Sequence, residues 1–377
     1  MSAEDFLERH WQKSPLFMPD ALPDALPELS ADELGWLATL DDVESRLVFS
    51  KKENSATHYR VEHGPFDEEL LANLPPENWT LLVQDVEKHL PVFRTRLQQA
   101  RFIPDWRIDD LMVSFAAPGG SVGPHRDNYD VFLCQGDGSR EWRIADADAE
   151  LTVMDSLELS LLEPFADDNP LQANPGDVLY LPPGIGHWGI ALDSCMTYSI
   201  GMRAPTLAEF TAGVSRILHR DIEHDKTEEL FYTDPDLMPG ESEPGLISLR
   251  TMERARKCFA NPATLDDDDF AMVFGSVVTD VKAWLAPESA SEEEIDAILN
   301  SGCPEIQVHG MARLAWFCGA NRNFVFANGL ARPVSAPELE QVREICNSRA
   351  ASVESSELFR WLAAKGAFDL PAGKQDD

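Results

Sequence analysis

The sequence lacks long apolar stretches and paired cysteines. No segment approaches the ~20 uninterrupted apolar residues that a membrane-spanning helix needs. The first residues, MSAEDFLERHWQKSP, also lack the apolar run of a secretory signal. The six cysteines form no C-x-x-C pair and show no regular spacing, which favours free thiols in a reducing compartment over a disulfide framework. We therefore expect a soluble, cytoplasmic protein that does not associate with membranes.

Positive charge is also scarce. The chain has 31 Lys and Arg residues against 66 Asp and Glu residues, a formal net charge of −35. Between Arg143 and Arg203 there is no Lys or Arg at all, whereas ten Asp or Glu residues occur there. Such a field repels nucleic acid and attracts cationic partners. The alternative is a general contribution to solubility, which acidic proteins commonly show.

The chain has 377 residues, a length that favours two or three domains. The pattern of apolar and polar residues changes along it. Residues 108–203 contain short apolar runs separated by Gly, Pro, Asn and Asp, which is typical of an all-β sandwich or barrel. After Pro205 the pattern is helical to about residue 285, with the run Asp266–Asp269 predicted to be a solvated loop.

The last segment combines helices with a small hairpin. A capping box of Ser335 and Glu338 predicts a helix to about residue 347, and a second helix is expected from about residue 354 to Gly366. Before them, NFVFANGLA predicts a hairpin that turns at Asn328-Gly329. This combination indicates a winged-helix-like module.

Two segments carry candidate metal ligands. The stretch GPHRDNYDVFL places His125 and Asp127 two residues apart, and PPGIGHWGIA supplies His187 sixty-two residues after the first histidine. Residues two apart on a β-strand point to the same side, so the first pair can bind one ion together. Two imidazoles and one carboxylate form the facial triad that non-haem Fe(II) uses, with positions left open for co-substrate and dioxygen.

These residues, with the opening FLERHWQKSPLF, resemble the JmjC family of 2-oxoglutarate oxygenases over about residues 1–205. The resemblance implies a double-stranded β-helix, a jelly-roll or cupin-like barrel, within an α+β chain. It also implies that a basic residue thirteen positions after the metal Asp binds the distal carboxylate of 2-oxoglutarate, which is Arg140 here. A guanidinium can bind a carboxylate through two parallel hydrogen bonds. The alternative for Arg140 is a surface salt bridge with Glu141 or another carboxylate, and Arg143 should point to the opposite face.

Strand parity adds further candidates. In IDDLMVSF, residues Asp110, Met112 and Ser114 share one face, and Tyr129 shares the parity of the metal ligands in HRDNY. If these faces line the barrel, Ser114 can hydrogen-bond the co-substrate, and the other three can receive a cationic substrate side chain. The alternative is that Asp110 caps a turn while Met112 and Tyr129 only pack.

The whole-chain plan resembles the ribosomal oxygenases. It comprises a JmjC domain over 1–205, a helical dimerisation segment over 206–290 and a winged-helix-like domain over 291–377. The similarity is to the bacterial members that hydroxylate an arginine of large-subunit ribosomal protein sixteen. It implies Fe(II), 2-oxoglutarate and O2, hydroxylation at the arginine β-carbon, a basic ribosomal protein substrate, a homodimer and a cytoplasmic location.

Two other classes of function remain open. A cupin-like metal enzyme that does not use 2-oxoglutarate would keep the triad but would have no use for Arg140. A winged-helix DNA-binding regulator with a degenerate barrel would need a basic recognition helix. Residues 301–377 have nine acidic and eight basic residues, so direct DNA binding is not expected.

Overall fold

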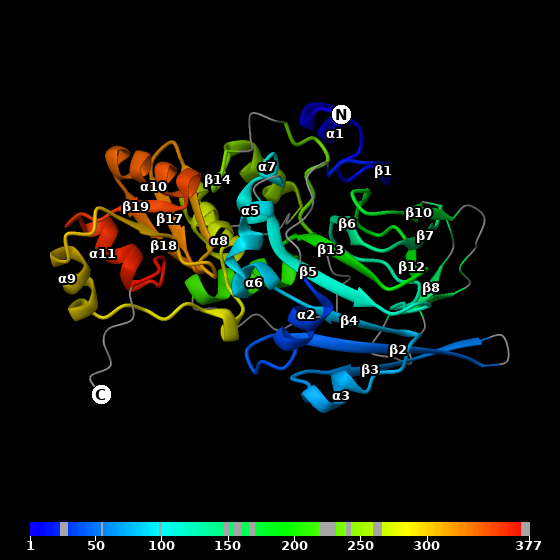
Figure 1. The fold of residues 1–377 in the computed structure, drawn as a ribbon. Helices are drawn as coiled ribbons and strands as arrows, with labels where there is room; N and C mark the ends of the chain where they lie inside the picture. Colours follow the sequence, from blue (N-terminus) through cyan, green and yellow to red (C-terminus); the bar gives the residue numbers. More distant parts are fainter. Residues whose placement is uncertain are drawn as a thin grey trace, which may run out of the picture. The chain divides into compact units, whose positions relative to one another are not determined.

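The computed structural model describes most of the chain, and the contacts divide it into two compact units. The described residues are 1–22, 29–53, 56–97, 100–146, 149, 151–153, 160–163, 165, 170–218, 231–238, 243–258 and 266–370. The first unit, called the barrel unit below, comprises Met1, Glu8–Gln98 and Asp109–Met202. The second, called the C-terminal unit, comprises Ser2–Leu7, Gln99–Ile108 and Arg203–Asp377. Figure 1 shows the elements of both units along the chain.

The barrel unit is built on two antiparallel sheets. The larger has the strand order β1-β11-β6-β13-β5-β4-β2-β3 and the smaller the order β10-β7-β12. Strands β8 and β9 form a separate pair. The strands are β1 (Leu16–Met18), β2 (Ser45–Glu53), β3 (Ala56–His63), β4 (Trp79–Val83), β5 (Ile108–Ala116), β6 (Val131–Asp137), β7 (Arg140–Ile144), β8 (Thr152–Val153), β9 (Leu162–Glu163), β10 (Leu171–Ala173), β11 (Val178–Leu181), β12 (His187–Ala191) and β13 (Cys195–Met202).

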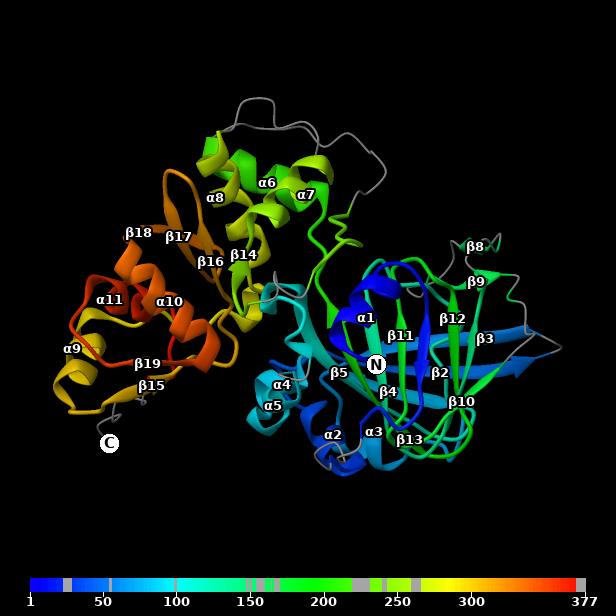
Figure 2. The same ribbon diagram turned by 90° about the horizontal axis from the view of Figure 1, so that it is seen from above.

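This arrangement confirms the predicted jelly-roll or cupin-like barrel, whose strands Figure 2 shows from above. The hydrophobic core of the barrel includes Val131 and Leu133 of β6, Trp142 of β7 and Leu179 of β11. Along β5, Asp110, Met112 and Ser114 lie on one face, because successive side chains of a strand point to opposite faces. The same alternation places polar groups of several strands on one inner surface.

Short helices are concentrated before β5. They are α1 (Ala3–Arg9), α2 (Ala31–Leu37), α3 (Glu68–Ala72), α4 (Val86–His89), η1 (Pro91–Phe93), α5 (Arg94–Leu97) and η3 (Asp105–Arg107). Helix α2 starts at a complete capping box, in which Ser30 and Glu33 each bind the backbone N–H of the other. Two free donors at the helix start are satisfied in this way, so the boundary is fixed locally.

The C-terminal unit is helical with a small sheet in the order β14-β16-β17-β18 and a pair β15-β19. The helices are α6 (Leu207–Leu218), α7 (Leu249–Cys258), α8 (Asp267–Val278), η5 (Ala283–Leu285), α9 (Glu292–Asn300), α10 (Ala336–Ser348) and α11 (Glu357–Ala364). The strands are β14 (Leu246–Ile247), β15 (Glu305–Gln307), β16 (Leu314–Cys318), β17 (Asn323–Ala327), β18 (Leu330–Val334) and β19 (Ala350–Ser352).

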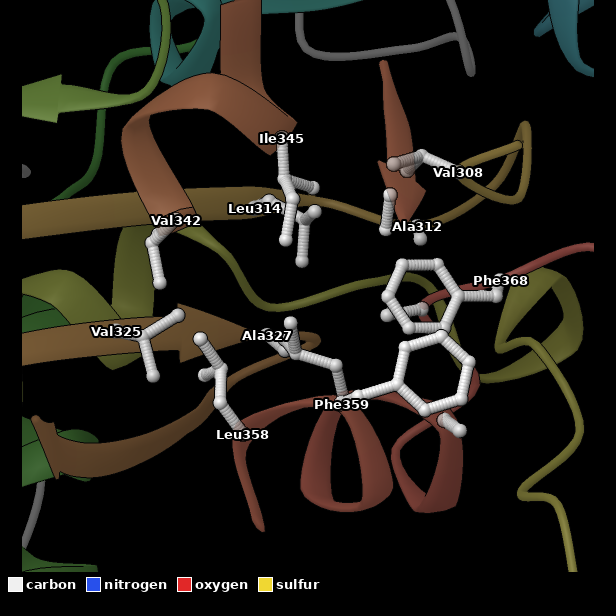
Figure 3. Packing of buried hydrophobic residues seen from close by; sticks show 14 of the residues in the cluster. Val308, Ala312, Leu314, Val325, Ala327, Val342, Ile345, Leu358, Phe359 and Phe368 are labelled. Carbon is white, nitrogen blue, oxygen red and sulfur yellow. The ribbon is translucent and has the colours of Figure 1, made fainter. Parts of the chain in front are cut away.

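The sheet of the C-terminal unit is buried on both faces. Phe324 and Phe326 of β17 pack with Phe274 of α8 and other aromatic residues. The alternate residues Val325 and Ala327 face the second core, in which Figure 3 shows side chains of α10 and α11. The helical segment and the C-terminal segment therefore pack on opposite sides of one sheet.

Several local predictions for this unit can be compared with the structure. The capping box of Ser335 and Glu338 opens α10, and the hairpin turns at Asn328-Gly329, both with positive φ, so these two predictions are confirmed. The prediction of a solvated loop at Asp266–Asp269 was wrong. Asp266 caps α8 by accepting from the N–H of Asp269, and the other acidic residues form the first turn. Carboxylates stabilise this position because the N-terminus of a helix is electropositive.

All six cysteines are free, as expected from their spacing. In the described part of the chain, no helix is both long enough and apolar enough to cross a lipid bilayer.

Candidate metal and co-substrate site

The three predicted metal ligands converge in the barrel unit. One donor atom from each of His125, Asp127 and His187 lies within 4.8 Å of the others, and no other such group of His, Cys, Asp and Glu was found among the described residues. His187 Nε2 lies 3.6 Å from Asp127 Oδ2. The two imidazole ring centroids are 4.2 Å apart. Two nitrogen donors and one carboxylate are the donor set that suits Fe(II).

The backbone brings the two histidines together in a way that the sequence did not predict. His125 and His187 form an isolated antiparallel bridge, with backbone hydrogen bonds of 2.9 and 2.8 Å in the two directions. Residues 126–130 are not a strand, so the strand that we predicted for HRDNY was wrong. Asp, Asn and the preceding Gly-Pro favour turns, which explains why the chain leaves extended structure here.

Backbone carbonyls orient both imidazole rings. The Nδ1 atom of His125 lies 3.0 Å from the carbonyl oxygen of Gly123, and that of His187 lies 3.0 Å from the carbonyl oxygen of Ile185. With Nδ1 as the donor, Nε2 keeps its lone pair for a metal. Burial and the neighbouring His125 lower the pKa of His187 to about 4, so its imidazole is neutral, as a metal ligand must be.

Ser121 connects the two histidine segments. Its buried hydroxyl accepts hydrogen bonds from the N–H of Gly123, at 3.0 Å, and from Nε1 of Trp188, at 2.9 Å. Tyr59 of β3 lies beside Ser121 and Trp188, and burial raises the pKa of its phenol to about 12. One hydroxyl thus ties the backbone beside His125 to the residue that follows His187.

The loop with Asp127 is held at two points. The backbone N–H of Gly184, a residue with φ of +81°, donates to the carbonyl of Asp127 at 2.7 Å. At the end of the loop, buried Asp130 accepts from the hydroxyl of Tyr180 at 2.6 Å and from Gln12 at 2.9 Å. The turn Pro182-Pro183-Gly184 therefore positions the carboxylate ligand as well as His187.

A cavity of about 290 Å³ contains all eight predicted site residues in its lining. Both sheets contribute to it. The lining residues are Arg46, Val48, Thr80, Leu82, Gln84, Asp110, Met112, Ser114, Val122, His125, Arg126, Asp127, Tyr129, Val131, Leu133, Arg140, Trp142, Ser160, His187, Thr197, Ser199 and Gly201. The faces chosen by strand parity on β5 and β7 are thus the faces that line this cavity.

Arg140 is a buried cation in this lining. Arg140 is 4% exposed, its guanidinium donates to Cys195 Sγ at 3.6 Å, and its Nε has no hydrogen-bond partner among the described residues. No carboxylate in the described residues forms an ion pair with it; Glu141 pairs instead with Arg143, at 2.7 Å. Arg143 stacks over Trp188 and is absent from the lining. Because a buried charge without a partner is costly, Arg140 is suited to receive an anionic ligand.

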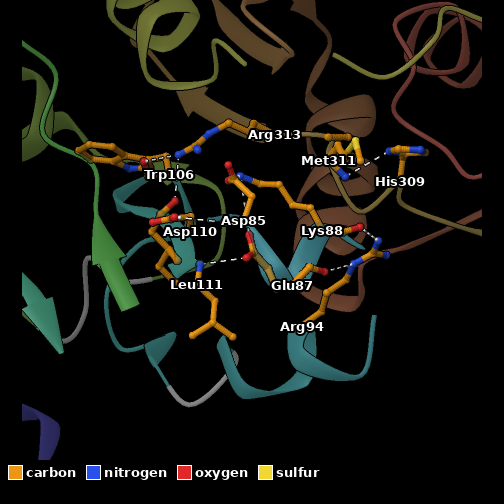
Figure 4. Close-up of polar contacts among 12 residues, drawn as sticks. Asp85, Glu87, Lys88, Arg94, Trp106, Asp110, Leu111, His309, Met311 and Arg313 are labelled. Atoms are coloured by element: carbon orange, nitrogen blue, oxygen red, sulfur yellow. Dashed lines mark hydrogen bonds and ion pairs between the residues drawn. The ribbon is translucent and has the colours of Figure 1, made fainter. Parts of the chain in front are cut away.

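Asp110 has a different environment. The residue is 9% exposed, and its carboxylate lies near Asp85 and Glu87, which Figure 4 shows beside it. Burial and the charges of Asp109, Glu87 and Asp85 raise its pKa to about 8. Ser114 is buried on the same strand, with its hydroxyl 3.5 Å from the carbonyl of Thr197, whereas Tyr129 is 43% exposed.

Some lining residues were not predicted from the sequence. Thr197, Ser199 and Gly201 alternate along β13, so the parity that identified Ser114 on β5 could have found them in MTYSIGM. Arg46 and Gln84 carry no such signal. These two residues reach the lining because β2 pairs with β4, although both strands lie far from the metal ligands in the sequence.

Comparison with known proteins connects this site to one family. The JmjC domain matches residues 96–210. The ribosomal protein uL16 3-hydroxylase of Escherichia coli is 39% identical over 254 residues, which cover 67% of this chain and 65% of that protein. A probable ribosomal oxygenase of Haemophilus influenzae is 38% identical over 229 residues, covering 59% and 54%. The chain thus aligns with less than two thirds of either curated relative.

Solved structures extend the likeness to nearly the whole chain. The structure of YcfD, a ribosomal oxygenase from Escherichia coli, has a TM-score of 0.70 and 30% identity, with 98% of each chain covered. The same protein in complex with cobalt and 2-oxoglutarate gives a TM-score of 0.68 at 29% identity, again with 98% of each chain covered. The chain therefore belongs to the JmjC-domain family of ribosomal oxygenases.

Proposed function

We propose that this protein is an Fe(II)- and 2-oxoglutarate-dependent hydroxylase that oxidises the β-carbon of an arginine in large-subunit ribosomal protein sixteen, uL16. The observation that carries the proposal is that one cavity contains a His-Asp-His group and a buried arginine, Arg140, with which no carboxylate of the described residues forms an ion pair. The His-Asp-His group suits Fe(II), and the buried arginine suits the distal carboxylate of 2-oxoglutarate. The likeness to a uL16 3-hydroxylase supports the substrate.

The residues around the site place the reactants. His125, Asp127 and His187 hold the iron, and Arg140 with Ser114 holds the far end of 2-oxoglutarate. Val131 and Leu133 of β6 and Trp142 of β7 add apolar surface to the lining. These apolar side chains exclude water, and this strengthens the ion pair between Arg140 and the carboxylate of 2-oxoglutarate. Iron, 2-oxoglutarate and O2 together supply the oxidising chemistry when bound.

The substrate side chain enters beside Asp110, Met112 and Tyr129. The carboxylate of Asp110 receives the positive charge, and the ring of Tyr129 supplies an aromatic face that attracts a cation. Met112 adds a polarizable apolar surface that adapts to the aliphatic part of a long side chain. The acidic stretch between Arg143 and Arg203 favours approach of a basic ribosomal protein.

The alternative of a cupin-like enzyme without 2-oxoglutarate does not explain Arg140. A guanidinium buried to 4% exposure without a carboxylate partner destabilises a protein unless a ligand compensates for it. Dependence of turnover on 2-oxoglutarate would separate the two functions.

The remaining parts of the proposal concern the whole molecule. We propose the division into a JmjC domain over 1–205, a dimerisation segment over 206–290 that forms a homodimer, and a winged-helix-like domain over 291–377. A cytoplasmic location agrees with a ribosomal protein substrate. Light scattering of the full chain, and of a chain altered on α6, would test the dimer.

The function is tested with total ribosomal protein. The enzyme is loaded anaerobically with Fe(II) and 2-oxoglutarate, exposed to air with the ribosomal proteins, and each protein is weighed by intact-mass spectrometry. We expect one protein to gain the mass of one oxygen, and fragmentation to place it on an arginine β-carbon. Asp127→Ala is the matched control, since it removes the anionic iron ligand. Equal oxygen incorporation by this variant, or none by wild type, would contradict the proposal.

A further inference from the structure

The two segments that carry the histidine ligands pair through their backbones at two separate points. The histidines themselves exchange two backbone hydrogen bonds, and the N–H of Ala191 donates to the carbonyl of Gly120 at 3.0 Å. Between these points, residues 121–124 and 188–190, all of them described by the structure, share no backbone hydrogen bond. The backbone pairing is therefore interrupted directly beside the two imidazoles.

The hydroxyl of Ser121 connects the two segments across this interruption. It accepts from the N–H of Gly123 on its own segment, at 3.0 Å, and from Nε1 of Trp188 on the other segment, at 2.9 Å. A serine oxygen has two acceptor sites, so these two donors occupy both. Ser121 is 3% exposed and is not part of the cavity lining, so its effect on the cavity must pass through its two partners.

Gly123 links the Ser121 hydroxyl to His125. Its N–H donates to that hydroxyl, and its carbonyl oxygen lies 3.0 Å from Nδ1 of His125. Gly123 has φ of +82°, and a Cβ atom there would lie only 3.0 Å from Cζ of Tyr59. Glycine accepts a wide range of backbone angles, so a contact from outside is needed to select this one. The position of the His125 ring therefore depends on Ser121.

Trp188 links the same hydroxyl to His187. The two residues are adjacent on β12, so their side chains point to opposite faces, and only His187 lines the cavity. The indole of Trp188 also packs against Phe165 in a T-shaped contact, with ring centroids 6.2 Å apart. Because the indole is held behind the strand, β12 cannot turn about its own axis without breaking the bond to Ser121. The tilt of the His187 ring is restricted in this way.

We propose that Ser121 is a positioning residue of the metal centre, and that its hydroxyl fixes the angle between the imidazoles of His125 and His187. This inference rests on the proposed function, because it assigns both imidazoles to a metal ion. Groups that orient metal ligands from behind are important for binding, and their loss commonly lowers metal affinity about 10- to 100-fold. Here a single hydroxyl acts on two ligands at once.

The test measures metal binding rather than turnover. Co(II) is titrated into the metal-free protein in the presence of 2-oxoglutarate, and the dissociation constant and the visible absorption of the bound Co(II) are recorded. Ser121→Ala should weaken Co(II) binding about tenfold or more, since two buried donors lose their acceptor and the imidazoles change their orientation. The absorption of the bound Co(II) should change as well, because it depends on the geometry of the ligands.

A double-mutant cycle shows whether the hydrogen bond itself causes this effect. Trp188→Phe keeps an aromatic ring and removes Nε1, which donates to Ser121. Each single change should weaken Co(II) binding, and the double variant should lose much less than the product of the two single losses.

Ser45→Ala is the matched control. Ser45 is also 3% exposed, donates to the carbonyl of Ala38 at 3.4 Å and lies outside the cavity lining. This variant should lower the Tm without changing the affinity for Co(II) or its absorption. If Ser121→Ala does not fold, Trp188→Phe decides the inference through the same two measurements.

Each outcome decides the inference. Unchanged Co(II) affinity and absorption in Ser121→Ala and Trp188→Phe would overturn it and leave the proposed function intact. Equal changes in Ser45→Ala, or fully independent losses in the cycle, would also overturn it, because they would show a general loss of stability. A wild-type protein that does not bind Co(II), or that binds it equally well after Asp127→Ala, would contradict the metal site and the proposed function together.

Discussion

Arg140 and Asp110 line one cavity and are both buried, but the protein surrounds them in opposite ways. Arg140 has no carboxylate within ion-pair distance among the described residues, whereas Asp110 is surrounded by further acidic groups. A charge buried for structural reasons normally has an opposite charge or several hydrogen bonds around it. Neither Arg140 nor Asp110 has a complete set of such partners, so each can bind a ligand of opposite charge. The cavity thus takes an anion at Arg140 and a cation at Asp110.

Removing the positive charge of Arg140 should have the largest effect, which is on the KM for 2-oxoglutarate. Arg140→Ala should raise the KM for 2-oxoglutarate roughly 10- to 100-fold, because it removes a charge-assisted carboxylate pair of about 1.5–3 kcal/mol. Metal affinity should stay the same, as titration with Co(II) followed by absorbance would show. Arg143→Ala is the matched control, since that residue pairs with Glu141 outside the cavity lining. A larger effect from Arg143→Ala would reverse the assignment.

Neutralising Asp110 should affect the substrate peptide rather than 2-oxoglutarate. Asp110→Asn nearly preserves shape, so it should reduce kcat/KM for a uL16 peptide about tenfold through loss of a charge-assisted hydrogen bond. The KM for 2-oxoglutarate should change little. Asp137→Asn serves as the control, because Asp137 ends β6, lies outside the lining and is not among the charges that shift the pKa of Asp110. Equal effects of Asp110→Asn on both KM values would show that the two charges do not act separately.

The acidic surroundings of Asp110 predict a dependence on pH. Its pKa is raised to about 8 by burial and by Asp109, Glu87 and Asp85, so much of the carboxyl is protonated near pH 7. A cationic side chain binds the ionised form, and its binding must therefore release a proton. We expect the KM for the peptide to fall several-fold as pH rises from about 6.5 to 8, and this slope to be flatter in Asp110→Asn.

The same raised pKa has a consequence for stability. Because the folded protein favours the protonated carboxyl, the stability contributed by Asp110 is present at about pH 4 and is lost as pH rises toward 8. The Tm difference between Asp110→Asn and wild type should therefore shift in favour of the variant over this range. A constant difference across the range would show that the carboxyl is ionised throughout.

Salt should produce the smallest of these effects. If the acidic stretch between Arg143 and Arg203 steers a basic substrate, kcat/KM for the peptide should fall several-fold as ionic strength rises, since exposed charges are screened within about 8–10 Å near physiological salt. Decarboxylation of 2-oxoglutarate without peptide should respond far less. A flat salt profile for the peptide would assign the net charge to solubility alone.

Local patterns in the sequence predicted much of this site. Alternation along β5 placed Asp110, Met112 and Ser114 on one face, and the same rule separated Arg140 from Arg143 on β7. Parity works for these segments because they are regular strands, in which side-chain direction depends only on position. The rule has no basis for residues 126–130, which are a loop. Asp127 reaches the histidines because Gly184 and the Asp130 contacts hold that loop.

The sequence by itself determined which donor types occur, their spacing and the regular strands that carry most of them. It could not determine the environment of any charge. In the part of the chain that the structure describes, no carboxylate pairs with Arg140, and Glu141 pairs with Arg143 instead. One oxygen of Asp110 is held by Gln84 and by the backbone of Asp85. Residues 84, 110 and 201 meet only when β4, β5 and β13 pair in one sheet. Burial and charge depend on such distant neighbours, so the tertiary structure alone decided what the cavity can bind.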